Sequence, residues 1–497
     1  MSLARSATLG AVWTIGLSVG SRLIGVVGTL ILTRYISPQV YGEVNVAVVL
    51  VLTVNALTRL GLINYMPAHP HAGREATFHA SLFHMVLGFV GLAVILLMRE
   101  PLGPLLNSPG MSYFMPGVVL AGLLGRFSAV PSAMLARDMR FATLGAARGI
   151  GELTYTLVAV LLAMAGWGGN AIVVGNIARS AIQLVIMSAA TGLSEWIRPC
   201  RLTLETTRRL FAFGIPLWIA GLAAEASRRW DNLLVARFLG PKVLGTYNLA
   251  YNLADIPASH VGEHIGDVLL PTFARMDAAR RRAAFVRACG LLSLVVFPLG
   301  VGLGAIAQTL AHTIFDPRWW VMAPMLSILS ALSVARPVGW LTTSYLQACD
   351  RTRVAMNLEI FKVVVLLTAI TALAQVGPLW VCAAAGIAFG AHSLAGMGYL
   401  SRLDGIPISS IVVQVARPLA ACVPLVGAVL GLRYLLDGFG IGHGVVSLAL
   451  EIIAGGLVYV AFAFVLAPGI ARDFLGLVFR ALHREKDDED EEPSEEE

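Results

Sequence analysis

Residues 32–47 read Leu32-Thr-Arg-Tyr-Ile-Ser-Pro-Gln-Val-Tyr-Gly-Glu-Val-Asn-Val-Ala47, and residues 235–250 read Val235-Ala-Arg-Phe-Leu-Gly-Pro-Lys-Val-Leu-Gly-Thr-Tyr-Asn-Leu-Ala250. The two copies share an Arg, a Pro, a Val, a Gly, an Asn and an Ala at the same spacing, in the pairs Arg34 and Arg237, Pro38 and Pro241, Val40 and Val243, Gly42 and Gly245, Asn45 and Asn248, and Ala47 and Ala250. Each copy joins two long apolar stretches. The chain is therefore predicted to be an internal duplication of a transmembrane hairpin, as in many secondary transporters.

Composition places the chain in a membrane. Hydrophobic residues make up 57% and charged residues 13%, against roughly 25% charged residues in soluble domains, and the mean hydropathy is +0.76. A helix that crosses a bilayer needs about 20 apolar residues. Such runs predict about fourteen spans, at 8–33, 39–63, 76–98, 112–136, 142–166, 169–190, 208–233, 242–270, 284–311, 321–345, 354–375, 378–401, 409–433 and 442–467.

The fold class that follows is an all-α polytopic membrane protein with two six-helix repeats and two extra C-terminal helices. An even number of helices per repeat makes the repeats parallel. A cytoplasmic N-terminus places most loop Lys and Arg residues on the cytoplasmic side, so both termini are expected there. The predicted parts are an N-terminal lobe at 1–190, a linker at 191–207, a C-terminal lobe at 208–401, the extra helices at 402–467 and an acidic, disordered tail at 468–497.

Arginines inside the predicted spans are the main functional signal, because each costs about 2.5 to 3.5 kcal/mol at a helix centre unless it faces a partner or a wet cavity. Several have no acidic residue one turn away on their own helix, and guanidinium groups bind phosphate in a bidentate way. They predict a cavity for an anionic substrate, with the candidates Arg22, Arg126, Arg179, Arg336 and Arg417, joined by Arg228 and Arg229.

Acidic and histidine residues in the spans are the candidates for gating or ion coupling. Three groups have the spacing of local ion pairs, namely Arg148 with Glu152, Glu359 with Lys362, and Glu225 with Arg228 and Arg229. His260, Glu263 and His264 match the His-x-x-Glu-His pattern of a zinc peptidase, but no catalytic domain surrounds them, so a lumen or gate role or simple packing is favoured. No metal or other cofactor is expected, and the chain has no P-loop for ATP.

The net charge of +6 is explained by the orientation of the loops, so we expect no nucleic-acid partner.

Four stretches together resemble the Wzx or PST type of polysaccharide flippase in the multidrug/oligosaccharidyl-lipid/polysaccharide (MOP) exporter superfamily. They are Leu32-Thr-Arg-Tyr-Ile-Ser-Pro-Gln-Val-Tyr-Gly42, Leu135-Ala-Arg-Asp-Met-Arg-Phe141, Phe213-Gly-Ile-Pro-Leu-Trp218 and the segment from Asp231 to Ala250. The resemblance implies alternating access in a bacterial inner membrane. It also implies an undecaprenyl-pyrophosphate oligosaccharide as substrate, moved to the periplasmic leaflet for exopolysaccharide, capsule or O-antigen synthesis, with membrane lipid, a polymerase and a chain-length regulator as partners.

The resemblance also points to particular residues. Arg22 is the nearest counterpart of a first-span arginine that helps to bind the headgroup in lipid-flippase relatives. Asp231 and Asn232 lie in the seventh span, where some relatives hold a cation, so coupling to Na+ or H+ stays open. The alternatives are a MATE-like drug/cation antiporter or a lipid II flippase on the same fold, and, from another class, a membrane glycan polymerase or ligase. We expect a transporter rather than an enzyme.

Overall fold

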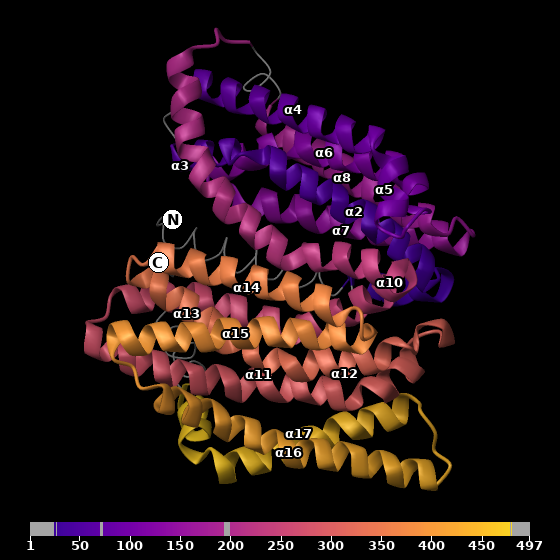
Figure 1. The fold of residues 1–497 in the computed structure, drawn as a ribbon, viewed down its shortest axis with the longest axis vertical. Helices are drawn as coiled ribbons and strands as arrows, with labels where there is room; N and C mark the ends of the chain where they lie inside the picture. The colour runs from indigo at the N-terminus through magenta and orange to yellow at the C-terminus, as the bar shows by residue number, and fades with distance from the viewer. Residues whose placement is uncertain (1–23, 26, 70–72, 193–198, 478, 480–497) are drawn as a thin grey trace, which may run out of the picture. The chain divides into compact units, whose positions relative to one another are not determined.

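The computed structural model describes residues 24–477 and residue 479, apart from residues 26, 70–72 and 193–198, and gives the backbone alone at 220, 257–268 and 271. Within this part of the chain the regular elements are helices, without a strand (Figure 1). Residues 24, 25, 27–35 and 468–477 are also helical. The elements are α2 (Pro38–Arg59), η1 (Leu62–Asn64), α3 (Tyr65–Ala68), α4 (Gly73–Leu97), α5 (Arg99–Leu105), α6 (Met111–Arg137), α7 (Phe141–Met164), α8 (Gly169–Thr191), α10 (Leu204–Ala274), α11 (Ala278–Ile314), η2 (Pro317–Trp319), α12 (Met322–Leu332), η3 (Ser333–Ala335), α13 (Arg336–Ala348), α14 (Thr352–Leu373), α15 (Pro378–Asp404), α16 (Ile408–Gly438) and α17 (Val445–Leu466).

The described residues contain 12 helices that are long and apolar enough to cross a membrane, which confirms an all-α polytopic membrane protein. One of them, Leu204–Ile256, is 53 residues long, far more than the about 20 that a single crossing needs. It covers the positions of the predicted span 208–233 and about half of the predicted span 242–270, and the helix is broken at Gly240, where φ is 79° and ψ is 169°. Most of the predicted first span lies outside the described residues.

The duplicated stretch begins a helix in both copies, by two different local devices. In the first copy the Ser37 side chain accepts a hydrogen bond from the Val40 amide at 3.4 Å and Pro38 occupies the first turn, as in a capped helix start. In the second copy Gly240 precedes Pro241, and its φ of 79° is a conformation that L side chains rarely adopt. The same proline therefore starts both helices, but only the second copy requires glycine before it.

The two copies pack against each other in one compact unit through their matched glycines. A Cβ atom on Gly42 would overlap the Pro241 carbonyl, and a Cβ atom on Gly245 would overlap the Pro38 carbonyl. Because the contact is reciprocal, each copy supplies both the glycine and the carbonyl that lies over the other glycine. Small residues at such positions let membrane helices approach closely.

We expect Gly42→Ala and Gly245→Ala each to destabilise the protein by about 2 to 4 kcal/mol, because a methyl group there forces two helix backbones apart. The measurement is the free energy of unfolding of the purified protein in detergent. Gly427→Ala on α16 is the matched control, since a Cβ atom there has nothing within 4 Å. Equal stability of all three variants would contradict the glycine contact.

A second pair of matched segments ends its helices in the same way. After α6, the Arg140 amide donates to the Leu135 carbonyl at 2.8 Å, and after α13 the Arg351 amide donates to the Leu346 carbonyl at 2.9 Å. The residue before each arginine, Met139 or Asp350, has a φ of 56°. Both helices thus end in a Schellman motif, which supports the predicted similarity of residues 135–141 to residues 346–354.

Contacts divide the chain into two compact units. The first contains the described residues up to Asn248, with Phe315–Trp319 and Ile370–Pro378, and the second contains Leu249–Ile314, Trp320–Ala369 and the described residues from Leu379 onward. Residues 208–248 therefore pack with the first unit, although the repeat in the sequence places them in the C-terminal lobe. The lobe boundaries follow the duplication rather than these contacts, and they remain a prediction.

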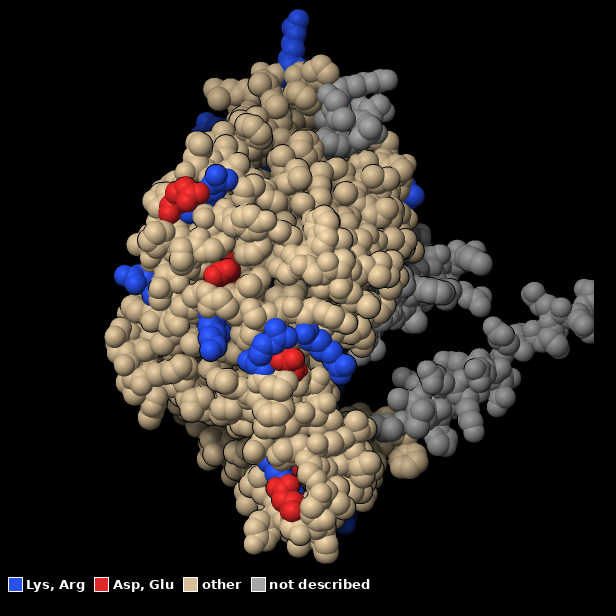
Figure 2. All heavy atoms as spheres, turned by 90° about the vertical axis from the view of Figure 1, so that its right-hand side faces the viewer, with Lys and Arg blue, Asp and Glu red and all other residues tan. Residues whose placement is uncertain are grey.

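Charged groups are sparse on one face of the molecule (Figure 2). On the face drawn in Figure 2, Lys, Arg, Asp and Glu side chains occur as small scattered groups, and most of the visible surface belongs to uncharged residues. Many of the large exposed side chains are Leu, Val, Ile and Phe. A surface of this kind suits contact with lipid.

Candidate functional site

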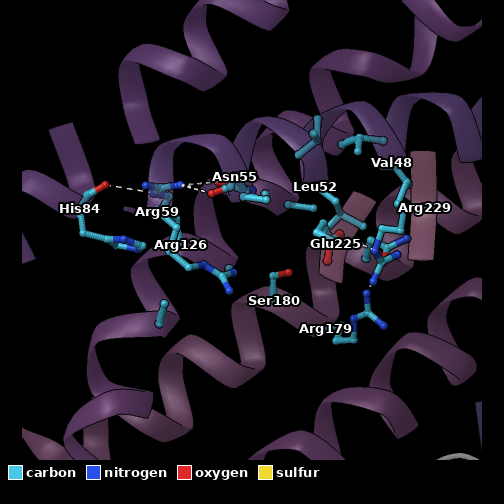
Figure 3. A pocket seen from close by; sticks show the side chains of 18 residues that line it. Val48, Leu52, Asn55, Arg59, His84, Arg126, Arg179, Ser180, Glu225 and Arg229 are labelled. Atoms are coloured by element: carbon cyan, nitrogen blue, oxygen red, sulfur yellow. Dashed lines mark hydrogen bonds and ion pairs between the residues drawn. The ribbon is translucent and has the colours of Figure 1, made fainter. Parts of the chain in front are cut away.

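A cavity of about 400 Å³ lies in the first unit among α2, α4, α6, α8 and α10. Its lining contains four arginines but only one carboxylate, so the walls are positively charged. Figure 3 shows His84, Arg59 and Arg126 toward one end and Glu225, Arg179 and Arg229 toward the other. The charged and polar lining residues are Asn55, Arg59, His84, Arg126, Asn176, Arg179, Ser180, Glu225 and Arg229.

Arg126 is fixed by the two helices that face it. Its Nε donates to the His84 carbonyl at 3.0 Å, Nη1 donates to the Asn55 side-chain oxygen at 2.9 Å and to the Thr58 hydroxyl at 2.8 Å, and Nη2 donates to the Thr58 carbonyl at 2.8 Å. The side chain reaches these acceptors past Gly88, where a Cβ atom would overlap the guanidinium. All of these acceptors are neutral. Arg126 therefore ties α6 to α2 and α4 while its positive charge stays beside the cavity.

Arg59 and His84 are the groups at this end whose side-chain polar atoms have no partner among the described residues. Arg59 is exposed and has no hydrogen bond or ion pair with any other described residue. His84 is 1% exposed, and neither ring nitrogen has a hydrogen-bond partner among the described residues. Buried polar atoms are nearly always paired, so the His84 ring is an exception, and the exposed Arg59 guanidinium gives this end of the cavity donors and charge for an anion.

At the other end two arginines are paired with carboxylates. The Nε atom of Arg229 lies 2.5 Å from Oε1 of Glu225 on the same helix, in agreement with the predicted local pair. Arg179 donates to Glu152 of α7 at 3.2 Å and to the Asn176 side chain at 2.6 Å. Both arginine side chains remain about 40% exposed, at 41% and 36%, so their charges can still reach a bound molecule.

The pairing of Glu152 corrects one expectation. Glu152 has the spacing of a local pair with Arg148, but the structure gives it to Arg179 on the next helix. Spacing along one helix detects neighbours on that helix only. For the same reason the sequence showed no acidic residue one turn from Arg179 on its own helix, although Glu152 of the neighbouring helix is its partner.

Asp231 and Asn232 are buried on α10 and do not line this cavity. The Tyr247 hydroxyl donates to Asp231 at 2.9 Å, and the Asn248 amide donates to the Asn232 side-chain oxygen at 3.2 Å. These bonds join the parts of α10 before and after the break at Gly240. They give both residues a structural role at the break, and the cation site stays a prediction.

In the second unit, Arg336 is 5% exposed and forms an ion pair with Asp255 of α10. Its guanidinium lies over the ring of Phe389, 4.4 Å from the centroid. The absence of an acidic residue on its own helix therefore did not mean an unpaired charge. Glu359 and Lys362 form the predicted local pair at 2.6 Å, and His392 Nε2 lies 3.6 Å from Glu359.

The structure brings together four of the predicted candidates, Arg126, Arg179, Arg229 and Glu225. Arg228 is exposed on α10 and Arg417 is exposed on α16, and neither lines this cavity. Arg22 lies outside the described residues. His260, Glu263 and His264 belong to the helical backbone of α10, but their side chains also lie outside the described part. In the described residues no group of three or more His, Cys, Asp or Glu could hold a metal ion.

Sequence reasoning missed Arg59 and His84. Both fall inside predicted spans, 39–63 and 76–98, so the rule that selected the other arginines applies to them equally. The polar residues Asn55, Asn176 and Ser180 carry no comparable signal. Only the packing of the helices shows that they face the cavity.

The comparisons with known proteins agree on family and fold. The polysaccharide biosynthesis protein family matches residues 31–324. The chain is 25% identical to the succinoglycan biosynthesis transport protein ExoT of Rhizobium meliloti over 91% of this chain and 90% of that protein. It is 23% identical to the lipopolysaccharide biosynthesis protein WzxC of Escherichia coli over 74% of this chain and 75% of that protein.

Two solved structures have the same fold. The lipid II flippase MurJ, in an inward closed conformation, matches with a TM-score of 0.72 and 13% identity over 93% of this chain and 99% of that one. An inward-facing MATE multidrug transporter of the MOP superfamily matches with a TM-score of 0.61 and 11% identity over 78% and 95%. This chain therefore belongs to the polysaccharide biosynthesis protein family and has the fold of the MOP-superfamily transporters.

Proposed function

We propose that this protein is a flippase that moves undecaprenyl-pyrophosphate-linked oligosaccharide repeat units from the cytoplasmic to the periplasmic leaflet by alternating access. The observation that carries the proposal is the cavity of the first unit, in which four arginines face a single glutamate. A cavity of this charge at membrane depth suits an anionic headgroup. The names of the relatives ExoT and WzxC support export for polysaccharide synthesis.

The two ends of the cavity suggest separate tasks. Arg59 and His84 have polar atoms without a described partner, so they hold the phosphates, and Arg126 holds the helices in place around them. Asn176 and Ser180 are neutral polar groups that suit sugar hydroxyls. Arg179 and Arg229 begin with carboxylate partners, so phosphate oxygens compete with Glu152 and Glu225 when the headgroup passes. Such an exchange conserves ion pairs during transport.

The remaining parts of the proposal concern the cell. The membrane is the bacterial inner membrane, both termini are cytoplasmic, and the exported unit passes to a polymerase and a chain-length regulator. A potential that is negative inside favours outward movement of anionic charge by about 2.3 kcal/mol per charge per 100 mV. A coupling cation, Na+ or H+, adds to the driving force from the membrane potential or replaces it. The protein acts by transport and carries out no bond chemistry.

The alternative functions on the same fold differ in the charge of the substrate that they carry. A drug/cation antiporter takes cationic substrates, which a wall of four arginines and one glutamate repels. A lipid II flippase carries the same kind of headgroup, so the cavity alone suits both pyrophosphate-linked substrates. The glycan that accumulates in cells without this protein distinguishes the two.

We expect Arg59→Gln to reduce export of lipid-linked repeat units about 10- to 100-fold, because a charge-assisted hydrogen bond to phosphate is worth about 1.5 to 3 kcal/mol. The measurement uses a strain that lacks this gene and carries the variant. A membrane-impermeant probe on spheroplasts reports how many repeat units reach the outer face.

Arg74→Gln is the matched control, since Arg74 is exposed at the start of α4 and does not line the cavity. It should export normally. His84→Leu removes ring nitrogens that have no described partner, so its export should fall while its unfolding midpoint does not. Normal sidedness in the deletion strain would overturn the flippase proposal, and normal export by Arg59→Gln would overturn the role of Arg59 alone.

A further inference from the structure

A second cavity, of about 580 Å³, lies in the second unit where α15 ends and α16 begins. The mechanism proposed above makes no use of it. Its lining combines a cation, two hydroxyl groups and an apolar wall, and consists of Ala395, Gly398, Tyr399, Ser401, Arg402, Leu403 and Ile408. The large apolar side chains are open to the surroundings, with Leu403 49% and Ile408 42% exposed.

The position of this cavity along the helix places it at the edge of the bilayer. α15 runs over 27 residues, about 40 Å at 1.5 Å per residue, and exceeds a hydrocarbon core of about 30 Å. Arg402 lies two residues before the end of this helix. Because the helix is longer than the hydrocarbon core, a guanidinium in its last turn is expected at the level of the lipid headgroups, beside the exposed side chains of Leu403 and Ile408.

The charge of Arg402 has no counter-charge among the described residues. Arg402 is exposed and forms no hydrogen bond or ion pair there. The nearby carboxylate of Asp404 is already bound to Arg351 at 2.9 Å, and the Asp404 carbonyl accepts from Arg282 at 2.8 Å. The only acid beside the cavity in the sequence segment 395–408 is thus occupied by another arginine.

The hydroxyl groups of Tyr399 and Ser401 also lack partners, since neither forms a hydrogen bond with any other residue that the structure describes. Together with Arg402 they supply donors for the two non-bridging oxygens of a phosphodiester. Ala395, Leu403 and Ile408 supply a surface for the methylene groups next to it. Basic pockets between transmembrane helices at the interface are where lipid headgroups bind.

We propose that this cavity is a binding site for an anionic glycerophospholipid of the surrounding membrane. Arg402 pairs with the phosphate, Tyr399 and Ser401 donate hydrogen bonds to it, and the acyl chains lie along Leu403 and Ile408. A zwitterionic lipid carries its own cation, which Arg402 repels, so the site prefers lipids with net negative charge. The inference depends on neither the cavity of the first unit nor transport.

The test is native mass spectrometry of the full chain in detergent with added phosphatidylglycerol or phosphatidylcholine. We expect the wild type to retain phosphatidylglycerol and Arg402→Gln to retain it about 10-fold less. Arg353→Gln is the matched control, because Arg353 is exposed at the start of α14 and does not line the cavity. Size-exclusion chromatography verifies that each variant is folded.

Two results would overturn the proposal. Equal loss in Arg402→Gln and Arg353→Gln would mean that the whole basic surface attracts the lipid, without a defined site. Stronger retention of undecaprenyl phosphate than of phosphatidylglycerol, lost in Arg402→Gln, would assign the cavity to a polyprenyl lipid instead. A preference for phosphatidylglycerol that depends on Arg402 and is weakened by Tyr399→Phe supports it, whatever the result of the export assay.

Discussion

Arg126→Leu should lower the free energy of unfolding by about 3 to 5 kcal/mol, the range for breaking a buried charged network. The leucine leaves acceptors on two helices unpaired, at His84, Asn55 and Thr58. Arg126→Lys keeps the charge but loses the planar fork that reaches all of these acceptors, so we expect a smaller loss. The measurement is the unfolding free energy of the purified variants in detergent.

Gly88→Ala tests the same network by another route, because its Cβ atom would occupy the space of the Arg126 guanidinium. It should destabilise the protein in the same direction as Arg126→Leu. The double variant should cost less than the sum of the single ones, since both break one set of hydrogen bonds. If Arg126→Leu is as stable as wild type and loses export alone, then Arg126 binds substrate and does not hold the helices.

Glu451→Leu should also destabilise by about 3 to 5 kcal/mol, because it leaves a largely buried guanidinium, that of Arg433, without its counter-charge. Glu451 of α17 is fully buried. Its carboxylate accepts from Arg433 of α16 at 3.1 and 2.9 Å and from the Thr309 hydroxyl of α11 at 2.7 Å. Unfolding of the purified protein measures the loss, and export is expected to fall only as far as the folded fraction does.

The double variant Glu451→Leu with Arg433→Met is the control for that result. Replacing both members of a buried ion pair by apolar residues is often neutral or stabilising, so we expect most of the lost stability to return. A double variant as unstable as Glu451→Leu would show that the carboxylate acts through Thr309 alone. This network also explains how α16 and α17, outside the duplication, are held to α11.

Much of the fold could be predicted from the sequence because hydrophobic length is a local property. The predicted spans 76–98, 112–136 and 142–166 correspond to α4 at Gly73–Leu97, α6 at Met111–Arg137 and α7 at Phe141–Met164. The break in α10 at Gly240 falls between two predicted spans, inside the duplicated stretch that joins them. Chain length and apolar composition dictate these limits in a bilayer.

The sequence predicted the charge of the candidate site, but only some of the residues that line it. Arginines inside spans predicted a cationic cavity, and Arg126, Arg179 and Arg229 line the cavity of the first unit. Their roles differ because of contacts with other helices, which spacing along one helix does not reveal. Arg126 is bonded to neutral acceptors of two other helices, and Arg179 has a carboxylate partner on a neighbouring helix.

By itself, the sequence determined that the chain is a duplicated, all-helical membrane protein with arginines inside its predicted spans. Apolar length and repeated motifs can be read directly from the order of the residues. Only the tertiary structure decided which charges are already neutralised. Arg336 is paired with Asp255 across 81 residues of chain, whereas the Arg59 guanidinium and the His84 ring nitrogens, at the cavity of the first unit, have no described partner. Electrostatic pairing depends on distance in space, which helix packing sets and sequence separation does not.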